Sequence, residues 1–165
     1  MVHEILGPKF DKMTVEALLE YIRVFRDDNI FAIAELLRRG VAVETLHEIT
    51  QITSFFIEAL EKIVKLEKIL KDNAWSLPIL RKAKEMGFSD QYIAGLWETS
   101  ETDVYLFRKE NSLYPAYRMV DTCHTNAYIP YFYSSYEGKS DSVITDKKKI
   151  IVLGAGPIRI GQGVE

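Results

Sequence analysis

The residues with the clearest chemical potential are the glycines that follow an apolar run near the end of the sequence. Residues 150–153 are Ile-Ile-Val-Leu, and the loop after them has glycines at positions 154, 156, 161 and 163. A β-branched run suits a buried parallel strand, and glycines let a backbone approach a phosphate, as at the start of a nucleotide-binding α/β domain. A complete βαβ unit of this kind needs roughly 30 residues or more, but the sequence stops at Glu165, before the helix and the second strand of the unit. We therefore expect the first strand of a further domain here.

Other candidate groups for chemistry are few. Cys123 and His124 are adjacent, but neighbours in an extended chain point in opposite directions, whereas a nucleophile and its base must converge. Cys123 is more simply explained as a small buried apolar residue. Asp121 could be a functional carboxylate, although a local cap or buried acceptor explains it more simply. The histidines at positions 3, 47 and 124 lack the spacing of zinc ligands, so the sequence predicts no catalytic residue and no metal site.

Two short segments with strong helix-start signals resemble a helix-turn-helix. Ser89 begins the first, and Ser100 with Asp103 three residues later forms a capping-box pattern for the second. A helix-turn-helix would place the second helix in the major groove of DNA. Its acidic residues at positions 101, 103 and 110 outnumber Arg108 and Lys109, so it has no positive surplus for phosphates. Nucleic-acid binding is therefore the alternative function, and a packed helical hairpin is the simpler interpretation.

Composition argues against several classes of protein. The 165 residues carry a net charge of −3, which gives no basic excess for nucleic acid or an acidic membrane surface. The single cysteine cannot form an internal disulfide and fits a reducing compartment, so we expect a cytoplasmic protein. No apolar run approaches the roughly 20 residues of a membrane-spanning helix, and the N-terminal residues lack the pattern of a signal peptide.

Capping and stop signals predict the elements that would position these groups. Helices are expected at about 14–25, 30–39, 43–49 and 53–71, then from near Pro78 to Gly87, and after Ser89 and Ser100. Residues 114–123 and 131–137 lack helical periodicity and are expected to be extended around a loop with Pro130. Their tyrosines could stack on bases, although semi-buried packing explains them more simply. Residues 138–146 are polar and are expected to form a linker.

These elements predict a mainly α fold class. An irregular helical domain with a few short extended segments is expected at 1–146, and the truncated first strand of an α/β domain at 147–165. Because an unpaired strand leaves backbone groups without partners, this strand should fray or add to an edge formed by 131–137 or to a neighbouring molecule.

Apolar spacing predicts the buried face of each longer helix. The expected stripes are Leu18, Ile22 and Phe25, then Ile30, Ile33, Ala34 and Leu37, then Phe56, Ala59, Leu60, Ile63 and Leu70. The longest helix also has Phe55, Ile57 and Leu66, which is more than one core-facing stripe needs. Such a helix either lies deep in its own core or makes an interface. The second alternative predicts a homo-oligomer.

Three stretches of the sequence together resemble one family. They are Val-Asp-Thr-Cys at 120–123, Tyr-Ser-Ser-Tyr-Glu at 133–137, and 152–165 with Gly-Pro-Ile-Arg-Ile-Gly-Gln-Gly at 156–163. The combination closely resembles the large subunit of carbamoyl phosphate synthase, in the central region between its two ATP-grasp halves. The resemblance extends upstream through 34–40, 47–50 and 87–90. Departures at Thr53, Phe55 and His124 affect fine contacts.

The resemblance implies that 1–146 is the oligomerisation domain and that 147–165 opens the carbamoyl-phosphate-forming ATP-grasp half. It implies a whole enzyme that is an ATP-dependent ligase, forming carbamoyl phosphate from bicarbonate, ATP and glutamine-derived ammonia for arginine and pyrimidine biosynthesis. The enzyme would use ATP and magnesium or manganese, whereas this segment alone is expected to hold no cofactor and to be inactive.

The resemblance also implies partners and a site. The partners are the two ATP-grasp halves of the same subunit, a small glutaminase subunit and further copies of the large subunit, with neither nucleic acid nor membrane. The loop residues that it places beside the internal tunnel and the second synthetase site are Gly154, Gly156, Pro157, Arg159, Gly161 and Gly163.

Overall fold

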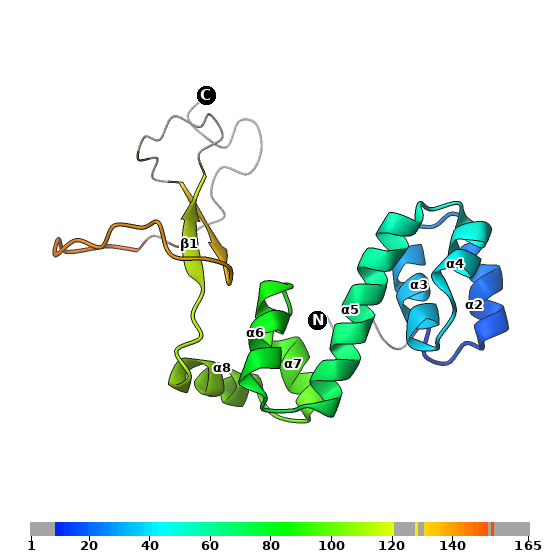
Figure 1. The fold of residues 1–165 in the computed structure, drawn as a ribbon, viewed down its shortest axis with the longest axis horizontal. Helices are drawn as coiled ribbons and strands as arrows, with labels where there is room; N and C mark the ends of the chain where they lie inside the picture. The colour runs from blue at the N-terminus through cyan, green and yellow to red at the C-terminus, as the bar shows by residue number, and fades with distance from the viewer. Residues whose placement is uncertain (1–8, 121–127, 129–130, 152, 154–165) are drawn as a thin grey trace.

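The computed structural model describes residues 9–120, 128, 131–151 and 153. Within them, seven helices precede a two-stranded antiparallel sheet, which confirms the mainly α fold class (Figure 1). The elements are α2 (Val15–Ile22), α3 (Asn29–Arg38), α4 (Val43–Thr50), α5 (Ser54–Asp72), α6 (Leu77–Glu85), α7 (Asp90–Trp97), α8 (Glu101–Glu110), β1 (Ala116–Met119) and β2 (Phe132–Ser135).

The helices build two lobes that share the long helix α5. In the N-terminal lobe, α2, α3 and α4 pack with the first part of α5, on the right of Figure 1. Its buried apolar residues are Phe10, Leu18, Ile22, Ala32, Ile33, Leu36, Leu37, Leu46 and Ile57. Arg39 closes this lobe, because its guanidinium donates hydrogen bonds to the carbonyl oxygens of Phe10, Asp11 and Met13.

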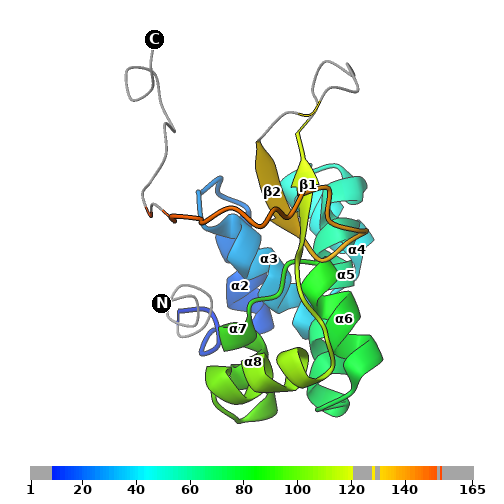
Figure 2. The ribbon, with the colours of Figure 1, turned by 90° about the vertical axis from the view of Figure 1, so that its left-hand side faces the viewer.

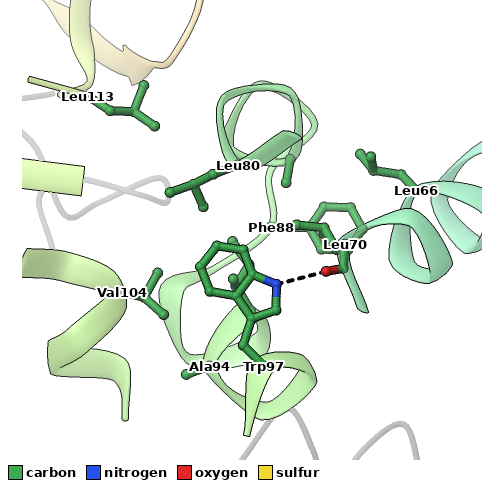
Figure 3. Packing of buried hydrophobic residues seen from close by; sticks show 10 residues of the cluster. Leu66, Leu70, Leu80, Phe88, Ala94, Trp97, Val104 and Leu113 are labelled. Carbon is green, nitrogen blue, oxygen red and sulfur yellow. Dashed lines mark hydrogen bonds between the residues drawn. The ribbon is translucent and has the colours of Figure 1, made fainter. Parts of the chain in front are cut away.

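In the C-terminal lobe, α6, α7 and α8 pack against the end of α5 (Figures 1 and 2). Leu66 and Leu70 of α5 lie in this second cluster with Leu80, Phe88 and Trp97 (Figure 3). The Trp97 indole N–H donates a hydrogen bond of 2.8 Å to the carbonyl oxygen of Leu70. This bond satisfies one of the last carbonyls of α5, which have no partner within the helix.

The predicted helix-start signals at Thr14, Ser89 and Ser100 are confirmed, whereas Asp28, the residue before α3, makes no side-chain cap hydrogen bond. The side-chain oxygens of Thr14 and Ser89 accept hydrogen bonds from the backbone N–H groups of Ala17 and Tyr92. Ser100 and Asp103 form a complete capping box at α8. These caps depend only on residues close in sequence, which is why they could be identified without the structure.

The first helix is shorter than predicted, because α2 ends at Ile22 rather than near Phe25. The side-chain amide of Asn29, buried at the start of α3, donates to the carbonyl oxygens of Ile22 and Val24 at 3.4 and 2.9 Å. These bonds cap the last turn and let the chain leave the helix. Phe25 is consequently 94% exposed, so its expected place in the buried stripe is wrong.

The buried faces of α3 and α5 also differ from the predicted stripes. On α3, Ala32 and Leu36 join Ile33 and Leu37 in the core while Ile30 is half-exposed, because α3 packs against both α2 and α5. On α5 the buried residues are Ile57, Leu66 and Leu70, whereas the predicted Phe56 and Ile63 are exposed. The two lobes contact different sides of α5, so one stripe could not describe it.

The two strands pair in the region where extended chain was expected. Ala116 pairs with Ser135 and Met119 with Phe132. The predicted linker is partly attached to β1, because the Asp141 carboxylate accepts from Arg118 Nε at 3.1 Å and from the Met119 N–H at 3.0 Å. By contrast, Ile150, Ile151 and Leu153 are exposed and lie in no strand. These described residues have no paired neighbour strand, and the strand that would open a further domain stays a prediction.

Candidate functional site

Most of the residues singled out from the sequence lie outside the described part of the chain. These are Gly154, Gly156, Pro157, Arg159, Gly161 and Gly163 of the glycine loop, and His3, Asp121, Cys123 and His124. His47 is described, and its Nδ1 lies 2.7 Å from the carbonyl oxygen of Ile52, where it joins α4 to the turn after it. Within the described residues, no three His, Cys, Asp or Glu side chains are grouped to hold a metal ion.

The geometry of α7 and α8 argues against DNA recognition. Arg108, one of the two cations counted on the would-be recognition helix, is buried and forms an ion pair with Asp90. A guanidinium held in this way is not available to a phosphate. Asp103 is exposed at the start of the same helix, where its carboxylate completes the capping box. The described surface of α8 therefore has even less positive charge than the sequence suggested.

Asp90, Lys84 and Arg108 form a buried ion triad. Arg108 Nε lies 3.0 and 2.9 Å from the two carboxylate oxygens of Asp90, and Lys84 Nζ lies 2.8 Å from Oδ1. Burial would raise the pKa of Asp90, but the hydrogen bonds from Arg108 and Lys84 outweigh it and lower that pKa. Lys84 also donates to the Phe88 carbonyl oxygen, and Arg108 to that of Leu113.

The triad is structural. It links α6, α7 and α8, and the ring of Tyr136, just after β2, lies 5.0 Å from Lys84 Nζ and 5.5 Å from the Arg108 guanidinium. Tyr136 therefore joins the sheet to the helices through cation–π contacts. The sequence analysis missed this cluster, because its members are far apart in sequence and no local pattern pairs them.

A concave surface, which we call the junction groove, lies between the lobes. It has a volume of about 360 Å³ and is bounded by α3, α5 and the turn between α6 and α7. Its apolar lining includes Ile30, Phe31, Ala34, Leu60, Ile63, Val64, Met86 and Phe88. Because residues of both lobes line it, this groove exists only when both are packed on α5.

The charged residues of the junction groove are paired with one another. Arg38 Nε and Nη2 lie 3.0 Å from the two carboxylate oxygens of Glu67, and Arg38 Nη1 lies 3.2 Å from Glu35. Tyr92 lies beside the pair, and burial together with the negative charge of Glu67 raises the pKa of its hydroxyl. Since these groups bind each other, the groove offers mainly apolar contact to an incoming molecule.

A second groove continues the first along the N-terminal lobe. It has a volume of about 290 Å³, and its lining includes Phe25, Ile33, Ile52, Phe56 and Ile57. Ile30 and Leu60 line both grooves, so the two form one continuous surface. We call this surface the groove face and define it by Phe25, Ile30, Phe56, Leu60 and Ile63.

The groove face is suited to binding rather than catalysis. Phe56 is 61% exposed and Ile63 41% exposed, and the ring of Phe55 packs edge-on against Phe56 at 5.4 Å. Contiguous exposed apolar side chains of this size mark sites where proteins bind one another. The face includes Phe56 and Ile63, which were predicted to be buried, whereas two of the three extra positions predicted to make an interface, Ile57 and Leu66, are buried and only Phe55 is exposed.

Comparison with known protein families favours the resemblance to carbamoyl phosphate synthase over the helix-turn-helix hypothesis. Residues 2–112 match the family model described as carbamoyl-phosphate synthetase large chain, oligomerisation domain. The chain belongs to this family. The matched residues include α2 to α8, and therefore both lobes and the whole groove face of this oligomerisation domain. The family is that of a ligase, and the resemblance inferred from the sequence is confirmed for this domain.

The match ends before β1, so the synthetase-half strand from residue 147 and the boundary at 146 stay predictions. No helix in the described ranges is long and apolar enough to cross a membrane.

Proposed function

We propose that this chain is the oligomerisation part of the large subunit of a glutamine-dependent carbamoyl phosphate synthase, in which it joins subunits through an apolar surface. The observation that carries the proposal is the coincidence of the family match with the groove face, since all five residues of the face lie within 2–112. Exposing large apolar side chains has a free-energy cost that association removes.

The chemistry of the synthase would belong to other parts of the enzyme. In this proposal, two ATP-grasp halves use ATP and magnesium or manganese to convert bicarbonate and ammonia into carbamoyl phosphate, and a small glutaminase subunit releases the ammonia. The product would serve arginine and pyrimidine biosynthesis in the cytoplasm. The chain from residue 147, with Gly154, Gly156, Pro157, Arg159, Gly161 and Gly163, would open the second synthetase half.

Two measurements test the proposal. Sedimentation velocity of the 165-residue chain across a wide concentration range should show a reversible increase in mass as concentration rises. Magnesium-dependent ATP hydrolysis and shifts of duplex DNA should both be absent at the same concentrations. A concentration-independent monomer contradicts the oligomerisation role, and saturable DNA binding would favour the helix-turn-helix alternative.

A further inference from the structure

We propose that a polar pocket between the α6–α7 turn and β2 binds a small inorganic oxyanion such as phosphate. The pocket has a volume of about 300 Å³ and is lined by Lys84, Glu85, residues 87–89 and residues 134–136. We call it the hydroxyl pocket, because serine or tyrosine residues lie on both of its sides. It contains none of the five residues that define the groove face, so the inference goes beyond the oligomerisation role.

Positive charge beside the hydroxyl pocket comes from the buried ion triad. Lys84 and Arg108 are two cations that share the single carboxylate of Asp90, so one positive charge is left in excess. The three side chains are at most 11% exposed, so water compensates this charge poorly. Within the described ranges, no second carboxylate lies in ion-pair distance of either cation. An anion in the pocket would therefore neutralise a charge that the fold itself leaves uncompensated.

Lys84 brings this charge to the wall of the pocket. Its side chain is 8% exposed, and its ammonium group binds Asp90 at 2.8 Å and donates to the Phe88 carbonyl oxygen at 2.6 Å. An ammonium group has three N–H donors, so one remains for a further acceptor. The Tyr136 ring, which also lines the pocket, lies 5.0 Å from Lys84 Nζ. An oxyanion beside this ammonium group would accept a charge-assisted hydrogen bond, roughly twice as strong as a neutral one.

Serine hydroxyl groups supply further donors. The Ser89 Oγ accepts a hydrogen bond from the Tyr92 N–H, and the Ser135 Oγ accepts one from the Glu137 N–H. A hydroxyl has one hydrogen besides its acceptor lone pairs, so both serines keep a hydrogen to donate. Ser89 and Ser135 come from opposite sides of the pocket. An ammonium group and two hydroxyl donors suit the several acceptor oxygens of a small oxyanion better than a cation or an apolar molecule.

Glu85, the carboxylate in the lining, limits the ligand to a small anion. It is exposed at the end of α6 and forms no ion pair with any other residue that the structure describes. Water and salt screen an exposed carboxylate more than the buried Lys84. A small oxyanion can stay beside Lys84, whereas a long polyphosphate would meet the like charge of Glu85, which is unfavourable.

Titration of the 165-residue chain with inorganic phosphate at constant ionic strength tests the site. Calorimetry should show one saturable site, and NMR spectra should show amide shifts at 87–89 and 134–136 that saturate over the same concentrations. Lys84→Met should raise the dissociation constant about tenfold or more, because the ammonium donor is lost. Lys82→Met is the matched control, since Lys82 is exposed on the same helix and does not line the pocket. It should leave binding unchanged.

Two further variants keep the buried triad intact. Glu85→Gln should tighten phosphate binding by about threefold, because a like charge leaves the rim. Ser135→Asp places a carboxylate in the hydroxyl pocket, so it should abolish phosphate binding and raise the melting temperature of the free chain. Circular dichroism should show the same helix content for all variants.

Three outcomes overturn the inference. They are the absence of saturable phosphate binding, binding that Lys84→Met and Ser135→Asp both leave unchanged, and binding that Lys82→Met weakens as much as Lys84→Met. The last outcome would mean that phosphate responds only to net charge. None of them changes the oligomerisation role, which is measured separately by sedimentation.

Discussion

Replacing Asp90 by asparagine should destabilise the C-terminal lobe more than any comparable surface change. The Asp90 side chain is only 11% exposed, and those of Lys84 and Arg108 are 8% and 10% exposed. Asparagine keeps the size of the side chain but leaves two buried cations without an anion. Removing one partner of a buried ion pair costs about 3–5 kcal/mol, because the remaining charge is uncompensated. For a chain of this length the melting temperature should fall by roughly 6–20 °C.

Thermal and urea unfolding would measure this loss. The matched control is Asp72→Asn, since Asp72 is exposed at the end of α5 and forms no ion pair within the described ranges. Adding Lys84→Met to Asp90→Asn removes one of the two unpaired cations and should recover part of the loss. If Asp90→Asn costs no more than the control, the triad contributes nothing to stability and the reasoning is wrong.

The same triad predicts a dependence of stability on acid. Because hydrogen bonds from Arg108 and Lys84 lower the pKa of Asp90 in the folded state, the folded chain binds this proton less readily than the unfolded chain. The contribution of Asp90 is complete above its ordinary pKa of about 3.9 and is lost as the pH falls through the lower folded value. The stability gap between the unchanged chain and Asp90→Asn should therefore narrow in acid. A gap that stays constant would contradict the shift.

Three further predictions concern α5 and its contacts. Arg38→Ala and Glu67→Gln, measured singly and together by urea unfolding, should show a coupling free energy of about 1 kcal/mol, and additive losses would contradict the pair. Leu66→Ala should lower the free energy of unfolding by about 2–5 kcal/mol and Ile63→Ala by less than about 1 kcal/mol, because only Leu66 is buried. A larger loss for Ile63→Ala than for Leu66→Ala would mean that α5 packs with a different face towards the core. Trp97→Phe should cost about 1–3 kcal/mol, because the Leu70 carbonyl oxygen loses the shorter of its two hydrogen bonds and keeps only the 3.4 Å bond from the Asn73 N–H; an unfolding free energy equal to that of the unchanged chain, measured by calorimetry, would exclude that role.

Sequence patterns predicted the helices well where the signal is local. The start of α7 at Ser89 and the capping box of α8 depend on side chains within three residues of the backbone groups that they bind. The i, i+4 pair of Glu61 and Lys65, at 2.7 Å, follows in the same way from helix geometry. No tertiary information is needed for these features, so the sequence was sufficient.

The features that the sequence did not predict depend on contacts between distant residues. The Asn29 side chain binds the carbonyl oxygen of Ile22, seven residues earlier in the chain, where α2 ends. Phe25 therefore lies on the surface, although its spacing in the sequence places it on the buried stripe. Arg38 and Glu67 are 29 residues apart, and Asp90 and Arg108 are 18 apart. Neither pairing has a periodic signature, so the Arg38–Glu67 pair of the junction groove and the buried ion triad could be found only from the structure.

The long helix explains why one domain has both a core and an apolar exterior. With 19 residues, α5 is roughly 28 Å long, which is enough for two clusters to pack at different points along it. The predicted stripe through Phe56, Ile63 and Leu70 does exist on the helix, but α6 and α7 cover only its last turns. Its first turns stay uncovered and become part of the groove face. The C-terminal lobe buries Leu70, at one end of this stripe. Association with another subunit would bury Phe56 and Ile63, so folding and association would use different parts of the same stripe.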